Sequence, residues 1–113
     1  MTFTSETRGS IAILKFSGRL VFEESLFALR ARVRELLQSG VKGFIFDFGG
    51  VPHCDSSGCG ELIGAYATIK KADAVLAFVH LTPRVRLLWE RVRLTEVFNI
   101  FAALPEAENF VLR

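Results

Sequence analysis

The stretch FIFDFGGVPHCDSSGCGELIGAY, from Phe44 to Tyr66, joins two hydrophobic patterns through a polar turn. The segment 44–48 is almost continuously apolar and is broken only by Asp47, which is typical of a strand that is covered on at least one face and lies near the centre of a sheet. After the turn, apolar residues recur at the spacing of one helix face: Cys59, Leu62, Ile63, Tyr66 and Ile69. A buried strand that leads into an amphipathic helix predicts an α/β fold.

The segments before this stretch contain two further strands and a helix. Alternating side chains predict strands at 2–8 and 10–18, paired through a turn at Gly9 and Ser10. A helix is expected from Phe22 onward, with a stop at Gly40. Its apolar face is formed by Phe22, Leu26, Leu29, Val33 and Leu36.

The segments after the stretch continue the alternation. We expect a buried strand at 74–81, a helix opened by Pro83, a short strand at 97–104 and a terminal helix that starts at Pro105. The apolar side of the Pro83 helix comprises Val85, Leu88, Trp89 and Val92. The order ββαβαβαβα predicts a mixed, largely parallel sheet of about four to five strands with about four helices and an antiparallel hairpin at one edge.

Length and composition limit the classes of protein that this chain can belong to. Its 113 residues are expected to form one domain, 1–113, and half of them are hydrophobic, so a packed core is expected. The N-terminus lacks the pattern of a signal peptide and no apolar run is long enough to span a membrane, so we expect a cytoplasmic protein without membrane insertion. A net charge of +2 is too small to indicate direct nucleic-acid binding.

The segment Asp55-Ser56-Ser57-Gly58 lies where sites occur in open α/β sheets, beyond the carboxyl end of a strand and at the start of a helix. Helix capping alone explains such residues, because Asp and Ser side chains accept the unpaired amides of a first turn. A serine hydrolase is not indicated: G-x-S-x-G is absent, and His53 and His80 are the only histidines available as a base. The phosphate-binding pattern G-x-x-x-x-G-K-[ST] is absent as well.

The two cysteines allow a metal site and a packing role. With His53 and His80, Cys54 and Cys59 supply four metal-ligating side chains, but the two cysteines are five residues apart, which is not the C-x-x-C spacing. Free cysteines beside a strand and on an apolar helix face are more often small core hydrophobes. We therefore expect packing residues, with no metal and no cofactor.

A serine at a helix start can also accept phosphate from another enzyme. The amides and the helix macrodipole stabilise the added charge of about −1.5 to −2, and the Asp55 carboxylate opposes it only in part. Phosphorylation at this point is expected to preserve the fold and to change the surface charge, as a binding switch requires.

From Phe46 to Ala107, and at FSGRL before the first helix, the chain resembles the STAS domain of bacterial anti-sigma-factor antagonists. The family pattern has a D-L-x-x-V strand end, then I-D-S-S-G-L-G-x-L, V-x-x-L-L, a leucine and x-x-F-x-I-F with an acidic, alanine-containing tail. The matching residues are Asp47, Val51, Asp55, Ser56, Ser57, Gly58, Gly60, Leu62, Val85, Leu88, Leu94, Phe98, Ile100, Phe101 and Ala107.

The resemblance implies a non-enzymatic phospho-switch in a partner-switching pathway. In this family an ATP-dependent anti-sigma-factor serine kinase phosphorylates the first serine after the aspartate, here Ser56. The unphosphorylated form binds the anti-sigma factor and frees the sigma factor, and a serine phosphatase restores it. Asp55 and Ser57 flank the acceptor, and Gly58 and Gly60 belong to the same loop. The resemblance also permits an alternative: a STAS module that is never phosphorylated and that binds a small ligand or is a subunit of a lipid-transport complex.

The sequence departs from the family pattern at three places. Val21 stands where an acid is common, with Glu23 and Glu24 as displaced acids, and the glycine turn before the fourth strand is replaced by 72–74. Cys54 and Cys59 stand where Ile or Met and Leu are usual, which preserves apolarity. We also note Phe27, which lies off the apolar face of its helix; it either anchors a partner or is buried by a wide helix face.

Overall fold

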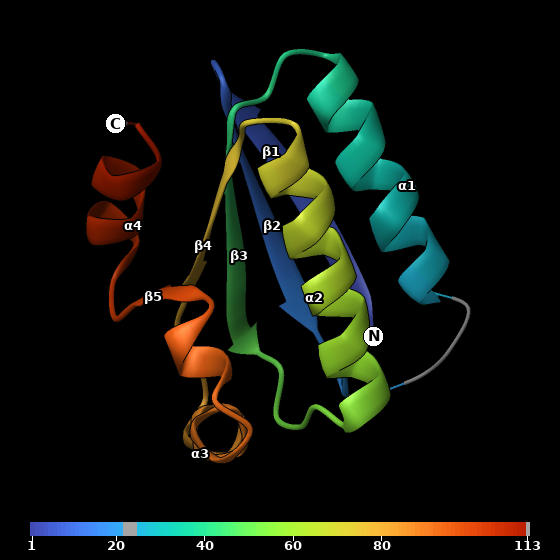
Figure 1. Cartoon of the computed structure of the whole chain (residues 1–113), viewed down its shortest axis with the longest axis vertical. Helices are drawn as coiled ribbons and strands as arrows, with labels where there is room; N and C mark the ends of the chain where they lie inside the picture. The colour runs from blue at the N-terminus through green and yellow to red at the C-terminus, as the bar shows by residue number, and fades with distance from the viewer. Residues whose placement is uncertain (22–24, 113) are drawn as a thin grey trace.

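The computed structural model describes residues 1–21 and 25–112 and contains a single five-stranded sheet in the order β1-β2-β3-β4-β5 (Figure 1). β1 and β2 form an antiparallel hairpin, and the pairs β2–β3, β3–β4 and β4–β5 are parallel. The strands are β1 Thr2–Arg8, β2 Ile11–Ser17, β3 Gly43–Gly50, β4 Val75–Val79 and β5 Asn99–Phe101. The mixed, largely parallel sheet with an edge hairpin is therefore confirmed.

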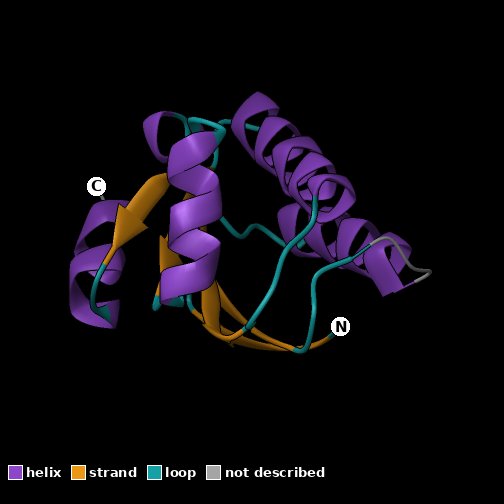
Figure 2. Cartoon of the chain, turned by 90° about the horizontal axis from the view of Figure 1, so that it is seen from below, coloured by secondary structure: helices purple, strands orange, loops and turns teal. Residues whose placement is uncertain are grey.

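The helices lie on both faces of the sheet. In chain order they are α1 Ser25–Gln38, α2 Ser56–Lys71, α3 Pro83–Arg91, the short 3₁₀ helix η1 Leu94–Glu96 and α4 Leu104–Val111. α1 and α2 cover one face, while α4 packs on the other (Figures 1 and 2). The predicted order of strands and helices is confirmed, with η1 as an addition between α3 and β5.

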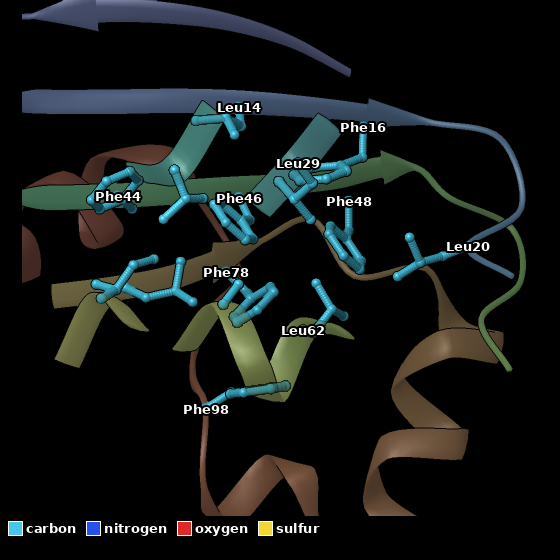
Figure 3. Close-up of a cluster of buried hydrophobic side chains, with 14 of the residues drawn as sticks. Leu14, Phe16, Leu20, Leu29, Phe44, Phe46, Phe48, Leu62, Phe78 and Phe98 are labelled. Carbon is cyan, nitrogen blue, oxygen red and sulfur yellow. The ribbon is translucent and has the colours of Figure 1, made fainter. Parts of the chain in front are cut away.

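Alternation along β3 divides its side chains between two cores. Phe44, Phe46 and Phe48 point into the larger core beneath α1 and α2, which Figure 3 shows as a stack of aromatic and leucine side chains. Ile45 belongs to the smaller core beneath α4. Since all four side chains are fully buried, β3 is the central strand that its apolar run predicts.

Three local expectations need correction or completion. Ile63 and Val92 were expected on buried helix faces, but their side chains are 44% and 53% exposed. Ile63 lies on the flank of α2 and not against the sheet, and Val92 caps the end of α3. The last strand is shorter than the expected 97–104 because Leu104 already begins α4. At 72–74, Asp73 takes the left-handed backbone conformation, with φ 59°, in place of a glycine.

The α1 face is confirmed where the structure describes it. Leu29, Val33 and Leu36 are buried in the larger core, and Gly40 follows the helix with φ 101°, as a left-handed stop requires. Phe22 and the side chain of Leu26 lie outside the described part of the chain.

Candidate functional site

Asp55 caps the N-terminus of α2 and fixes the position of the two serines. Its backbone is extended, with φ −100° and ψ −179°, and its Oδ1 accepts a hydrogen bond of 2.8 Å from the Gly58 amide. Ser56 and Ser57 are the first two helical residues, and both side chains are exposed. Neither hydroxyl forms a hydrogen bond with any residue that the structure describes. Asp55 therefore caps the helix, and the hydroxyls of Ser56 and Ser57 are exposed to solvent.

The segment after β2 holds the start of α2 in place. Leu20 forms a parallel bridge with Cys54: its amide donates to the His53 carbonyl at 2.8 Å, and its carbonyl accepts from the Asp55 amide at 3.1 Å. Gly58 packs directly on the Leu20 backbone, where a Cβ would overlap the carbonyl oxygen. The Asp-Ser-Ser-Gly segment is therefore held by hydrogen bonds to the Leu20 backbone, and the close contact with that backbone leaves no space for a side chain at Gly58.

The two glycines of the family pattern differ in their surroundings. A Cβ on Gly60 would meet nothing within 4 Å, and Gly60 is exposed on α2. Packing within the chain therefore does not require glycine at position 60, whereas it does at Gly58.

A groove of about 610 Å³ lies between α2 and α3, next to Ser56. Ile63, Leu87 and Val92 contribute apolar side chains that remain 44%, 50% and 53% exposed. The complete lining is His53, Cys54, Asp55, Ser56, Cys59, Gly60, Ile63, Arg84, Leu87, Leu88, Arg91, Val92 and Leu94. Ser56 belongs to this lining and Ser57 does not, which distinguishes two otherwise similar serines.

The charged side chains that line the groove are Asp55 at the start of α2 and Arg84 and Arg91 on α3, so cations are in excess. The two arginines are exposed and form no ion pair within the described ranges. The loop that leads into α3 is tied to the loop after β3, because the Thr82 hydroxyl donates to the Val51 carbonyl at 2.8 Å. An apolar groove with two unpaired cations suits a partner that carries apolar and acidic side chains.

Cys54 and Cys59 line the groove as buried thiols whose sulfur atoms are 3.4 Å apart. The hydrogen bond from the Cys54 thiol, with a smaller contribution from the Trp89 indole N–H, lowers the pKa of Cys59. The same hydrogen bond and burial raise the pKa of Cys54. Their predicted burial is confirmed. Their mutual contact was not predicted; it arises here because the extended chain ends at Asp55 and α2 begins at Ser56, between the two cysteines.

The remaining candidates lie elsewhere or outside the described residues. Phe27 is 63% exposed on α1, so the alternative that a wide helix face buries its side chain is wrong. Glu23 and Glu24 lie outside the described residues, and Val21 is half-buried. α1 and α2 begin at the same end of the molecule (Figure 1) and are joined by an ion pair of 3.1 Å between Arg30 Nη2 and Glu61 Oε2.

The two histidines do not share a site. His53 lines the groove, whereas His80 Nδ1 lies 3.1 Å from Asp47 Oδ1 at the ends of β3 and β4. In the described ranges, no group of three or more His, Cys, Asp or Glu side chains could hold a metal ion. His53, Cys54, Cys59 and His80 are thus not brought together as the four-ligand set that their residue types would allow.

Among the helices of residues 1–21 and 25–112, none has the length and apolar character needed to cross a membrane. The model of the STAS domain family matches residues 2–107. The fold resembles an anti-sigma factor antagonist from Mycobacterium paratuberculosis, with a TM-score of 0.82, 19% identity and coverage of 99% of this chain and 94% of that one.

Two other solved structures share the fold. The phosphorylated form of the Bacillus cell fate determinant SpoIIAA matches with a TM-score of 0.75 and 19% identity, covering 99% of this chain and 100% of that one. A sulfate transporter family protein from Wolinella succinogenes matches with a TM-score of 0.74 and 18% identity, covering 94% and 88%. The family match spans nearly all of the sheet and its helices, and the chain therefore belongs to the STAS domain family.

Proposed function

We propose that this chain is a cytoplasmic anti-sigma-factor antagonist, without enzymatic activity of its own, whose partner binding is switched by phosphorylation of Ser56. One observation carries the proposal: an exposed Ser56 hydroxyl, free of hydrogen bonds to the described residues, sits on the wall of an apolar groove. The proposed partners are an ATP-dependent anti-sigma-factor serine kinase and a serine phosphatase.

The groove supplies the docking surface in this proposal. The anti-sigma factor places apolar side chains against Ile63, Leu87 and Val92, and acidic side chains near Arg84 and Arg91. Full burial of an apolar side chain contributes on the order of 1.5–3 kcal/mol, and these three are already about half buried, so each adds roughly half of that. The three side chains alone do not offset the cost of association, and the proposed complex therefore also needs the charged contacts and the further surfaces described below.

Phosphorylation of Ser56 changes this surface without disturbing the core. The phosphate adds a charge of about −1.5 to −2 to the groove wall, where it repels acidic partner groups and must be desolvated before apolar contact. The fold tolerates the charge because Ser56 is the first residue of α2, where the macrodipole favours an anion. Phosphorylation thus weakens partner binding while the domain remains folded.

Two further regions extend the proposed partner surface. Phe27 offers an exposed aromatic ring on α1, the neighbour of α2. Glu23 and Glu24, just before α1 in sequence, are proposed as acids that contact the kinase in place of the acid missing at Val21. Asp55, Ser57, Gly58 and Gly60 shape the loop that the kinase must recognise.

The test uses the anti-sigma-factor kinase of the same organism, with ATP and magnesium. We expect one phosphate on Ser56 and no phosphate on the S56A variant. In S57A, the control on the adjacent residue, the phosphate should still be found on Ser56, even where the altered loop slows the reaction. S56D is expected to lose binding to the kinase, while S56A retains it. Phosphate on Ser57, or unchanged binding by S56D, would contradict the proposal.

A second candidate function is a STAS subunit of a transport complex that binds a small or lipid ligand and is never phosphorylated. The apolar groove of about 610 Å³ favours it, as does the shared fold with a sulfate transporter family protein. Native mass spectrometry of the protein purified from its own cells separates the two. An apolar ligand with unmodified Ser56 supports the second function, and phosphoserine without a ligand supports the first.

A further inference from the structure

The contact between Cys54 and Cys59 spans the segment that contains the proposed phosphate acceptor. The two cysteines flank the segment 55–58, and their sulfur atoms lie 3.4 Å apart. A disulfide bond is about 2.05 Å long, so the sulfurs need to approach by roughly 1.4 Å to be joined.

The surroundings of the two sulfurs make them chemically unequal. The Cys54 thiol favours the thiolate of Cys59 by hydrogen bonding and thereby lowers its pKa, and the pKa of Cys54 rises for the same reason. Trp89 is fully buried, and its indole N–H has no hydrogen-bond partner among the described residues. The indole N–H dipole acts to lower the pKa of both thiols, less strongly than the contact between the two sulfurs, while burial acts to raise both.

The pair is within reach of a small reagent. Both cysteines line the groove between α2 and α3, which also contains Ser56. A hydroperoxide is small enough to enter a space of about 610 Å³, whereas the bulk of each cysteine side chain remains buried. The Cys59 thiolate is the nucleophile in such an encounter, because thiolate and not thiol reacts.

We propose that Cys54 and Cys59 are a redox modification site, a thiol pair that hydrogen peroxide converts to a disulfide across the first turn of α2. The Cys59 thiolate attacks one peroxide oxygen, the O–O bond breaks, and the departing hydroxide takes a proton to become water. Cys59 is then a sulfenic acid. The Cys54 sulfur attacks the Cys59 sulfur, the S–O bond breaks, and the hydroxyl leaves as water with the Cys54 proton. Overall, two thiols are oxidised and one peroxide is reduced to two waters.

The disulfide restrains the switch segment. It closes a covalent ring through Asp55, Ser56, Ser57 and Gly58, so the first turn of α2 can no longer open independently of the Cys54 backbone, which is bridged to Leu20. Resting on the proposed function, this predicts slower phosphorylation of Ser56, because a kinase has to draw the acceptor hydroxyl into its own active site.

The first test needs no partner protein. The reduced protein is treated with hydrogen peroxide, quenched with N-ethylmaleimide and measured by intact and peptide mass spectrometry. We expect a loss of about 2 Da, a cross-link between Cys54 and Cys59, and full reversal by dithiothreitol. Hydrogen exchange at the amides of 56–58 should slow in the oxidised form. Two cysteines that still accept maleimide after peroxide, or that cross-link only between molecules, would refute the proposal.

Matched variants resolve the order of the steps. C54A should stop at a sulfenic acid on Cys59, trapped by dimedone, and C59A should leave Cys54 unoxidised. C54S and C59S repeat the comparison with a smaller change in side-chain volume. Disulfide formation in the wild-type protein is itself a test that needs no variant. If the disulfide forms but the kinase does not phosphorylate Ser56, the redox proposal is supported and the phospho-switch is contradicted. If the kinase phosphorylates Ser56 but peroxide forms no disulfide, the phospho-switch is supported and the redox proposal is contradicted.

Discussion

Gly58 packs directly on the backbone of Leu20, with no room between them for a side chain. The Leu20 carbonyl that a Cβ would overlap is the same group that accepts the Asp55 amide at 3.1 Å. The strand-to-helix connection that presents Ser56 therefore depends on close contact between two backbone segments. This contact explains why a glycine follows the two serines.

Replacing Gly58 with alanine is expected to destabilise the protein by about 1–3 kcal/mol, because the start of α2 must move away from Leu20. Urea unfolding measures the change. The matched control is G60A in the same helix, where an added Cβ would meet nothing within 4 Å beyond its chain neighbours and the backbone of its own helix. Removing a glycine from a helix there should be neutral or stabilise by up to about 1 kcal/mol. If G58A and G60A changed the free energy of unfolding equally, the close contact with Leu20 would not be what requires glycine at position 58.

The elements that depend on interactions between residues close in sequence were predicted correctly. The apolar run at 44–48 and the helical spacing after Ser56 specify a central strand and the helix that covers it, and both are observed. The hairpin also follows from local chemistry, since Gly9 adopts a φ of 60° between two strands in full register. Such features depend on a residue and its near neighbours.

The groove was not predictable by the same reasoning. Ile63 and Val92 are apolar and fall on periodic helix faces, so periodicity places them in the core. Their exposure arises from the space left between α2 and α3, a distance that no local pattern encodes. The contact between Cys54 and Cys59 is similar: it appears only once Asp55 ends the extended chain and begins the helix.

The cap of α2 gives a second prediction. D55A should destabilise the protein by about 1 kcal/mol, since the Gly58 amide loses the acceptor that it meets at 2.8 Å. D55N is the matched control, because the Asn side chain also caps well and should recover most of the lost stability. Thermal or urea unfolding of both variants measures the difference. If D55N were as unstable as D55A, the carboxylate charge and not the hydrogen bond would be the main contribution.

Leu87 tests whether the groove binds a partner. Its side chain is half exposed, so L87S should change the free energy of unfolding by no more than about 0.5 kcal/mol while weakening the complex with the anti-sigma factor. Calorimetric titration measures the binding. The contrasting variant L112S alters a side chain that is also exposed but absent from the groove, and it should bind normally. Equal binding by all three proteins would place the partner elsewhere.

Phe27 tests the second part of the proposed partner surface. With 63% of its surface exposed, Phe27 contributes little to the core, so F27S should leave stability within about 0.5 kcal/mol of the wild type. If the ring anchors the partner, the affinity should fall at least tenfold, which corresponds to about 1.4 kcal/mol. An unchanged dissociation constant for F27S would remove α1 from the binding surface and leave the groove between α2 and α3 as the whole site.

The unequal thiols predict a pH profile. Because the hydrogen bond from Cys54 lowers the pKa of Cys59, Cys59 should react with iodoacetamide first and should keep reacting below the ordinary cysteine pKa of about 8.5. Burial and the Asp55 carboxylate act in the opposite direction. C54A removes the largest favourable interaction, so the midpoint of the Cys59 profile should move to higher pH. A midpoint that stays in place in C54A would mean that the sulfur contact does not stabilise the thiolate.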